Sequence, residues 1–442
     1  MKFKTEQELL DFTKNIEGKK FKEIDKKNLL KEIPNDKGLL GKIVEYGFYG
    51  YEPNNNPKSD FEELGIELKV SGYRKNKKGD FSAKERLVLS MIDYNQIIYE
   101  DFLQSQFWSK NKKLLIIWYE FEEKFKKDKG EFRIDYYQLY DMKKDVNVIK
   151  NDFDTIRDKV IKEKADELGG RTPTTYLGAC KKGKKGTDIK KYSNKNLEAA
   201  PRAFELKNSF MTAILRNFLE SHKSNKLTTD KVSPYEYVYS KIEPYFGENQ
   251  LEIAKKLEIP IEAIPKNINK QISNKIIGTD KFLNERYDIF EKTYYAIKNV
   301  PVDNNMELLE RLSFRNLKLE EFESDWEDSI WKSYFEDVII ILILYQGSKG
   351  SKNGERILKD VKEITFTEDD LKSFENAYEM IQKTIETQNI ENLPVPEKSY
   401  PLVIAPRGKK GDNAYGTFLD KNETKTCFML SKDFVNDKLK YS

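Results

Sequence analysis

Two acids and a lysine follow one another early in the chain, at Asp60, Glu67 and Lys69. Glu67 and Lys69 stand two positions apart in a mainly apolar segment that reads as a strand. Successive strand residues point to opposite faces, so these two side chains share one side while Leu68 faces the core. The spacing therefore brings two carboxylates and an ammonium into one small volume.

These residue types could carry out phosphodiester hydrolysis. That reaction needs a hard cation held by oxygen ligands, which Asp60 and Glu67 could supply. It also needs a group that orients and helps to deprotonate water, and Lys69 suits that role because a lysine pKa responds strongly to its surroundings. By itself the spacing is weakly specific, since 35% of the residues are charged. The alternative interpretation is the solvated face of an edge strand.

Several stretches in order resemble the Sau3AI/MutH family of endonucleases over most of residues 25 to 220. The segment with Asp60, Glu67 and Lys69 matches that family's Asp, Glu and Lys, which belong to the wider PD-(D/E)xK nuclease class. Residues 84 to 90 and 109 to 118 continue the match. The resemblance implies that these three residues are catalytic and that the two acids hold Mg²⁺.

The resemblance also implies two further site residues. Residues 37 to 45 look like the helix before the family's active-site strand, and Glu45 inherits that helix's acid, as a catalytic residue and a metal ligand. The family carries an accessory active-site lysine at the position that aligns with Lys110, where Lys112 and Lys113 are close neighbours.

A second group of residues is expected to meet DNA. Residues 175 to 183 resemble the family loop that reaches DNA, and Lys182 is its best-matched contact. The mismatch-repair nickases have an arginine in place of Cys180 and a tyrosine in place of Glu205, so base contacts by those side chains do not carry over. Lys181, Lys182, Arg202 and Lys207 could read guanine or clamp phosphates. All the candidates for DNA binding are Lys37, Lys181, Lys182, Arg202, Lys207, Arg407, Lys409 and Lys410.

The elements that must position these residues can be read coarsely from the apolar pattern. Helices are expected at 6–16, 24–32, 38–48, 150–166 and 209–220, and strands at 65–72, 84–93, 114–121 and 204–207. Helices around a mixed sheet predict an α/β, or mixed α+β, fold.

The chain reads as two tandem restriction-endonuclease-like domains, each a central mixed sheet flanked by helices. The predicted boundaries are a catalytic domain at 1–222, a linker at 223–238 and a degenerate copy at 239–442, since weak matches to the first half recur there in order. Ala296 and Lys298 replace Glu67 and Lys69, and Phe282 replaces Glu45.

The second copy retains one acid near the place of Asp60, namely Asp288, which alone makes a poor magnesium site. We therefore expect it to be non-catalytic and to bind DNA, or to act allosterically, through the basic loop with Arg407, Lys409 and Lys410. A purely structural partner is the alternative.

Composition limits the remaining chemistry. The chain has 442 residues and a net charge of +3, so attraction to nucleic acid must come from local clustering. The single histidine, His222, lies in a polar stretch, and Cys180 and Cys427 show no metal-ligand spacing. Without a signal peptide or an apolar run of about 20 residues, a cytoplasmic protein with no membrane contact is expected.

The resemblance implies a Mg²⁺-dependent type II restriction endonuclease of a restriction-modification system. It would cut double-stranded DNA at 5'-GATC-3', leaving 5'-phosphate and 3'-hydroxyl ends, and a cognate methyltransferase would act on the same site. Because the target is palindromic and one chain holds one site, self-association on DNA is expected for double-strand cleavage.

Two alternatives stay open. A MutH-like strand nickase of mismatch repair is one, although the tandem second copy argues against it. A catalytically silent DNA-binding protein is the other, but clustered carboxylates would repel a phosphate in the absence of a metal.

Overall fold

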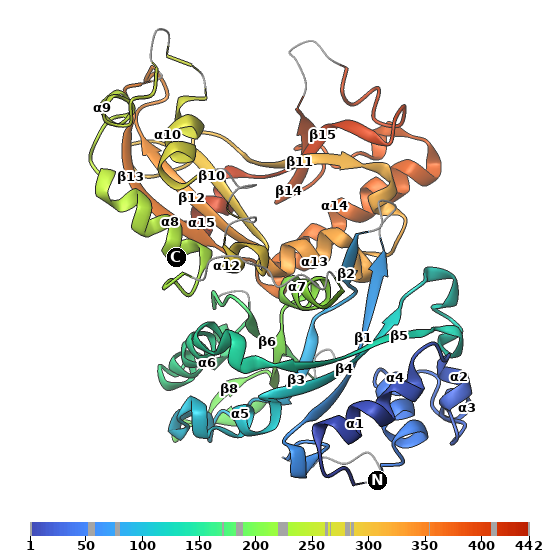
Figure 1. The fold of residues 1–442 in the computed structure, drawn as a ribbon. Coiled ribbons are helices and arrows are strands. Elements are labelled where there is room, and N and C mark those ends of the chain that lie inside the picture. The colour runs from blue at the N-terminus through green and yellow to red at the C-terminus, as the bar shows by residue number, and fades with distance from the viewer. Residues whose placement is uncertain are drawn as a thin grey trace. The chain divides into compact units, whose positions relative to one another are not determined.

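The computed structural model describes residues 2–51, 58–75, 80–169, 172–182, 189–219, 229–260, 264–265, 267–278, 283, 287–352, 354–407 and 413–440. The chain divides into two compact units, Met1–Asn225 and Lys226–Ser442, and each has its own hydrophobic core. Helices flank mixed sheets in both units (Figure 1), so the predicted mixed α/β fold is confirmed.

The first unit is built on a four-stranded mixed sheet. Its strands, in spatial order, are β2 (Phe81–Ala83), β1 (Glu67–Lys75), β4 (Lys113–Glu120) and β5 (Ile134–Asp141). β1 and β4 run parallel, and the other neighbours are antiparallel. Alternate residues of β4 enter different core clusters on its two faces, which explains its unbroken apolar run.

A smaller antiparallel sheet and two groups of helices complete this unit. The sheet contains β3 (Leu87–Met91), β9 (Arg202–Leu206) and β6 (Leu177–Lys181), and β7 (Lys190–Tyr192) pairs with β8 (Leu197–Ala199). On one face of the main sheet lie α1 (Glu6–Thr13), α2 (Phe21–Ile24), α3 (Leu29–Glu32) and α4 (Leu39–Lys42). The other core cluster includes α5 (Gln106–Asn111), α6 (Val146–Ile161) and α7 (Asn208–Leu219).

The prediction of a single helix at residues 24–32 is wrong. The Asp25 carboxylate accepts hydrogen bonds from the backbone N–H groups of Leu29 and Leu30, both at 2.9 Å. An aspartate bonded to nearby backbone competes with the helix, so α2 ends at Ile24 and α3 begins at Leu29. The strand expected at 84–93 is likewise confined to Leu87–Met91.

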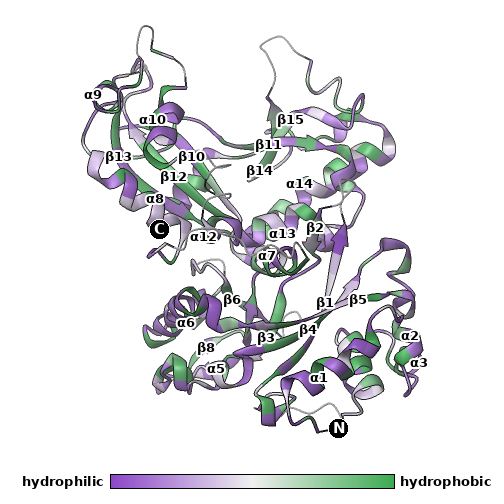
Figure 2. Ribbon diagram, viewed as in Figure 1, coloured by the Kyte–Doolittle hydropathy of each residue, from purple (hydrophilic) through white to green (hydrophobic). Residues whose placement is uncertain are grey.

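The second unit repeats this arrangement. Its mixed sheet contains β10 (Tyr295–Val302), parallel to β12 (Ile339–Gln346), and then antiparallel β13 (Ile357–Ile364). Figure 2 shows β12 as a hydrophobic strand, like β4 buried along its length. The antiparallel sheet contains β11 (Leu312–Lys318), β15 (Glu423–Leu430) and β14 (Leu402–Pro406).

The helices of the second unit complete the parallel. They are α8 (Pro234–Ile242), α9 (Gln250–Lys256), α10 (Ile268–Ile277), α12 (Asp288–Glu291), α13 (Ile330–Asp337), α14 (Glu368–Thr387) and α15 (Lys432–Leu439). Helix α8 begins inside the range expected as linker, and residues 220–228 lie outside the described residues. Of the helices in the described part of the chain, none has the length and apolar character needed to cross a bilayer.

Backbone bonds fix how the two units correspond. Phe121 N donates to Tyr73 O at 2.8 Å where β4 ends, and Gly347 N donates to Val302 O at 2.9 Å where β12 ends. Tyr73 and Val302 are therefore equivalent positions.

Six positions earlier, the same register sets Ala296 opposite Ile340, as Glu67 is opposite Leu114. Lys298 then corresponds to Lys69. This structural register agrees with the alignment drawn from the sequence.

Candidate active site

A tight turn brings Asp60 beside the start of β1. Phe61 N donates to Ile66 O at 2.9 Å, and Gly65 closes the turn with a φ of +63°, a conformation that glycine adopts readily. The Leu68 N–H donates to Asp60 Oδ2 at 2.9 Å, and the Asp60 N–H donates to Glu67 Oε2 at 3.3 Å. The two acids are thus held side by side, as the spacing predicted.

Two ammonium groups meet the same glutamate oxygen. Lys69 Nζ lies 2.8 Å from Glu67 Oε1, and Lys110 Nζ lies 3.7 Å from it. Both lysine side chains are largely buried, at 17% and 18% exposed, and Glu67 is 4% exposed. Lys110 stands in α5, whose N-cap Ser105 accepts from the Trp108 N–H.

The neighbours of Lys110 lie elsewhere. Lys113 pairs with Glu6, and the Lys112 side chain lies over Gly65. Lys110 is thus the lysine of this group that pairs with Glu67.

Glu45 reaches the site from a π-helical turn, Ile43–Phe48. Gly47 lets this turn pack closely on α2, since a Cβ there would stand 2.1 Å from Ile24 O. π-Helical turns often occur at functional sites. The charges of Lys69, Glu67 and Lys110 act on the Glu45 carboxyl group.

Burial and like charge dominate the electrostatics. Burial, with Glu67 and Glu45 nearby, raises the pKa of Asp60 to about 6, although the Leu68 N–H and Lys69 oppose the shift. Burial also raises the pKa of Glu45, with Lys69 acting in the opposite direction. Carboxylates that repel one another in a partly dry site are stabilised by a cation.

The donor set fits a hard divalent cation. Within the described residues, no three histidine, cysteine, aspartate or glutamate side chains gather closely enough to hold a metal by themselves. A cation here would have Asp60 and Glu67 as ligands and complete its shell with water and phosphate oxygens, a common arrangement for Mg²⁺. Glu45 is an electrostatic neighbour of Asp60 and Glu67 but does not form a three-carboxylate metal site with them. Its part in metal binding stays a prediction.

The residues of the first unit that were predicted to contact DNA fall into two groups, one at the surface and one buried. Lys37 is exposed in the turn before α4, Lys181 is exposed at the end of β6, and Lys182 follows it half-buried. Arg202 and Lys207 are buried: Arg202 Nη1 donates to Ala179 O at 2.9 Å and Lys207 Nζ to Thr174 O at 2.5 Å. A DNA contact by either of these two would require that bond to open.

In the second unit, Arg407 is exposed and its Nη1 donates to Phe314 O at 2.5 Å. Asp288 pairs with Lys292 at 3.2 Å. Lys409, Lys410, Phe282 and His222 lie outside the described residues.

The sequence reading missed two buried acids, because each is recognised by contacts with distant residues. Asp152 in α6 accepts from the N–H groups of Thr175, Tyr176 and Leu177 at 2.7 to 2.9 Å and so fixes the entry to β6. Glu205 pairs with Arg86 at 3.2 Å.

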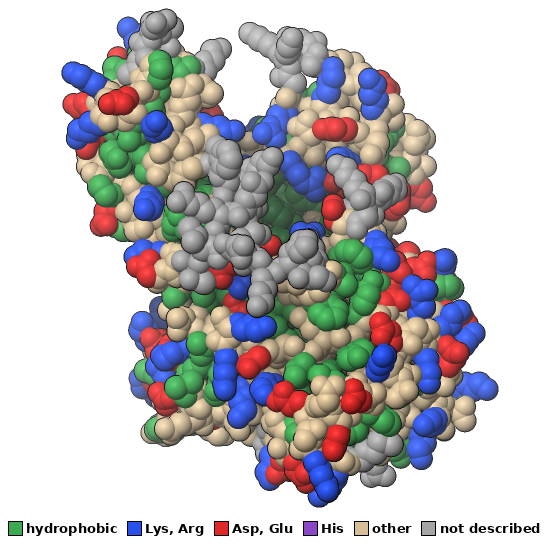
Figure 3. All heavy atoms as spheres, viewed as in Figure 1, with side chains coloured by type: hydrophobic (Ala, Val, Ile, Leu, Met, Phe, Trp, Pro, Cys, Tyr) green, Lys and Arg blue, Asp and Glu red, His purple; other side chains and the backbone are tan. Residues whose placement is uncertain are grey.

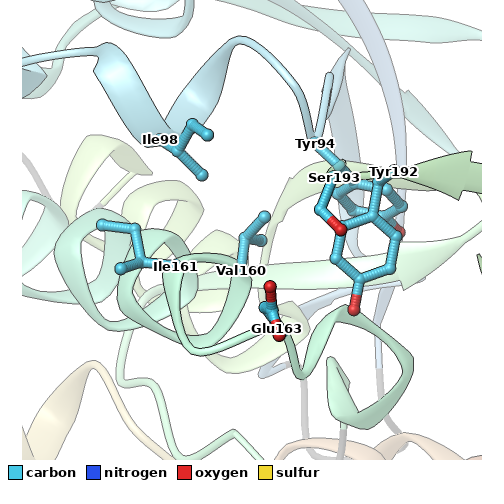
Figure 4. A pocket seen from close by; sticks show the side chains of 7 residues that line it. All are labelled: Tyr94, Ile98, Val160, Ile161, Glu163, Tyr192 and Ser193. Atoms are coloured by element: carbon cyan, nitrogen blue, oxygen red, sulfur yellow. The ribbon is translucent and has the colours of Figure 1, made fainter. Parts of the chain in front are cut away.

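A separate cavity of about 280 Å³ opens beside the end of α6 (Figure 4). Tyr94, Tyr192 and aliphatic side chains line it, and Glu163 is its acid. That acid pairs with Lys195 at 2.7 Å, so the cavity offers no site for the chemistry described above. Over the visible surface, acidic and basic side chains are interspersed (Figure 3), consistent with the small net charge.

Comparison with known proteins bears on this geometry. Residues 49–152 match the family model of the DNA mismatch repair enzyme MutH, a range that contains Asp60, Glu67, Lys69 and Lys110. The chain is also 28% identical over 418 residues to the type II restriction enzyme Sau3AI of Staphylococcus aureus, covering 89% of this chain and 82% of that protein. These matches support a Sau3AI/MutH-like restriction endonuclease.

Such an enzyme is a site-specific deoxyribonuclease, which as a class binds double-stranded DNA and uses a divalent metal. The match to Sau3AI is too long to fit in the first unit alone, so it extends into the second. Glu45 lies outside the range matched to MutH.

Proposed function

We propose that this protein is a Mg²⁺-dependent type II restriction endonuclease that cuts double-stranded DNA at 5'-GATC-3' and leaves 5'-phosphate and 3'-hydroxyl ends. The observation that carries the proposal is the convergence of Asp60 and Glu67 with Lys69 and Lys110 within hydrogen-bond or ion-pair range. This set combines oxygen ligands with cations in a largely buried site, as hydrolysis of a phosphodiester requires.

Each residue has a role in this proposal. Asp60 and Glu67 would hold Mg²⁺, which when bound would stabilise charge on phosphate oxygens and make water a better nucleophile. Lys69, held at Glu67, orients the attacking water. Lys110 stabilises charge on the scissile phosphate, and Glu45 supports the metal or its water shell.

The described part of the chain carries one such set, since Ala296 occupies the place of Glu67 in the second unit. Cutting both strands of a palindrome therefore calls for two molecules on the DNA, while a monomer nicks. Analytical ultracentrifugation tests this step: a DNA-bound monomer that breaks both strands in one event would contradict it.

The second unit is proposed to be non-catalytic and to bind DNA, with Arg407 and the nearby Lys409 and Lys410 as contacts. The exposed position of Arg407 supports this role. Arg407→Ala should weaken DNA binding without changing the cleavage rate of saturated enzyme. If binding is unchanged in that variant, a structural role for the second unit gains support.

The decisive experiment uses unmethylated plasmid, Mg²⁺, the wild type and Lys69→Ala, followed by sequencing of the product ends. Cuts at GATC by the wild type alone would support the chemistry and the specificity together. Cuts at another sequence would retain the nuclease and reject GATC. Retained binding without cleavage under any divalent metal would favour a silent DNA-binding protein.

The same assay separates a second candidate, a MutH-like strand nickase, which the match of residues 49–152 to that enzyme favours. A nickase would convert supercoiled plasmid to open circles and stop there. We also propose that a methyltransferase acts on the same DNA sequence. The enzyme would work in the cytoplasm, where it meets DNA.

A further inference from the structure

The antiparallel sheet of the first unit has one apolar face and one polar face. Leu87, Leu206 and Leu177 stand abreast on β3, β9 and β6, and all three enter the core. Neighbouring strand positions point the other way, so Glu205 and its cross-strand neighbour Gly178 belong to the opposite face.

On that polar face a buried acid holds an arginine. Glu205 Oε1 lies 3.2 Å from Arg86 Nη1; the glutamate side chain is 8% exposed and the arginine side chain 32%. Gly178 makes room for this acid, because a Cβ there would stand 2.9 Å from Glu205 Oε1. The Glu205 carboxylate is thus buried beneath the pair, and the Arg86 guanidinium is the more exposed of the two groups.

The pair lies near residues of the predicted DNA loop and is linked through the backbone to β1. Cys180, beside Glu205, also interacts electrostatically with Arg86 and Lys182, so the four side chains form one cluster. Two residues before Arg86, the Lys84 N–H donates to Gly72 O of β1 at 2.9 Å. Arg86 is thereby tied to the strand that begins with Glu67.

The second unit lacks this cluster. There Leu312, Leu430 and Leu402 stand abreast in the same way, which makes Arg311 the counterpart of Arg86. The counterparts of Glu205 and Gly178 are Met429 and Val403. The acid and the glycine that accommodates it are both present only in the copy that carries the catalytic carboxylates.

We propose that Arg86, oriented by Glu205, reads a guanine of the recognition sequence through its O6 and N7 atoms. Guanine presents two acceptors in the major groove that match an arginine fork. A phosphate would be repelled by the Glu205 carboxylate, whereas a neutral base edge is not, so the pair favours base contact over backbone contact. This inference rests on the proposed function, because it assigns the base-reading residue of the same enzyme.

The test measures binding of full-length protein to duplexes in which 7-deazaguanine replaces one guanine of the cleaved sequence at a time. Every protein carries Lys69→Ala so that no strand is cut. The parent should bind about tenfold more weakly when the critical guanine loses its N7. With Arg86→Ala added, that ratio should fall to about one. With Arg86→Lys added it should fall part of the way, since a lysine can reach O6 and N7 but lacks the planar fork of a guanidinium.

Arg157→Ala is the matched control, because its guanidinium pairs with Asp154 at 3.2 Å on α6. It should keep the tenfold ratio. The proposal is overturned if Arg86→Ala keeps the parent's ratio at every guanine, or if the parent discriminates at none. It is also overturned if Arg86→Ala weakens all duplexes equally and lowers the log–log salt slope by about one, which marks a phosphate contact.

Arg86→Ala leaves the buried Glu205 carboxylate without its cation and could therefore fail to fold. Arg86→Lys keeps a positive charge beside Glu205, so it tests the proposal in a protein that retains this ion pair. The plasmid assay decides the proposed function separately. If the cleaved sequence differs from GATC, the duplexes are built on that sequence, and the result for Arg86 still stands.

Discussion

The strands β1 and β10 occupy equivalent places in the two units and carry different chemistry. Glu67 and Lys69 on β1 form an ion pair, whereas Lys298 on β10 has Ala296 beside it and donates to Ser313 O at 2.7 Å. The same register sets Glu336 of α13 where the first unit has Lys110.

This difference shows that the fold and the charged residues of the candidate site vary independently between the two units. Strand order and core burial are alike in both units, so they do not depend on the charged set. The lysine of the second unit is satisfied by a backbone carbonyl, while the carboxylates of the first remain crowded and partly dry. Crowding of like charges marks the unit in which a metal is expected.

The largest expected effect comes from the two equivalent lysines. Lys69→Ala should lower the cleavage rate by about 100- to 1,000-fold, because charge stabilisation and water orientation are lost together. Lys298→Ala should leave the rate of saturated enzyme within about twofold of wild type. Single-turnover cleavage of a labelled duplex measures both, and equal losses in the two variants would contradict the assignment of one catalytic unit.

Asp152→Ala should destabilise the first unit by about 3 kcal/mol, because three buried N–H groups lose their acceptor and Lys207 loses a nearby counter-charge. The equivalent of Lys207 in the second unit is Ser431, and Ser431→Ala should change stability by less than about 0.5 kcal/mol. Urea unfolding followed by fluorescence measures both. Similar losses would show that this anchor is not particular to the first unit.

Asp60→Asn should abolish cleavage and yet stabilise the first unit at pH 7 to 8 by roughly 1 to 3 kcal/mol. The folded pKa of about 6 lies above the usual 3.8, so the native state holds a proton that the unfolded chain has released. Stability therefore falls as pH rises from about 4 to 6, and asparagine removes that loss.

The control for this prediction is Asp288→Asn in the second unit, where the carboxylate pairs with Lys292. Asp288→Asn should not increase the stability of the second unit. Thermal melts at pH 5 and pH 8 provide the comparison, and an Asp60→Asn protein less stable than wild type at pH 8 would contradict the proposed crowding.

The smallest expected effect is on pH dependence. Because only the ionised carboxylate binds a cation, metal affinity should fall by up to tenfold per pH unit as pH drops below the Asp60 pKa of about 6. Calcium titration by calorimetry between pH 5 and 8 measures this. An affinity that is flat across this range would exclude Asp60 as a ligand.

Much of the site could be predicted from local sequence. The alternation of β1 puts Glu67 and Lys69 on one face whatever surrounds them, and the structure shows their contact. The apolar run of β4 likewise indicated a strand buried on both faces.

Other features depend on residues distant in sequence. Arg86 and Glu205 are 119 positions apart, and Asp152 is at least 23 from the N–H groups that it accepts from. The sequence offers Arg202 and Lys207 as candidate DNA contacts, yet tertiary packing turns both side chains toward backbone carbonyls.

The amino-acid sequence alone sets the fold class, the face on which Glu67 and Lys69 stand, and the replacement of Glu67 by alanine in the second copy. These follow from short-range periodicity and residue type. Only the tertiary structure decided which lysine joins Glu67, which basic side chains are buried, and how strongly Asp60 resists ionisation. Burial and electrostatic interactions depend on distances in space, which chain spacing does not specify.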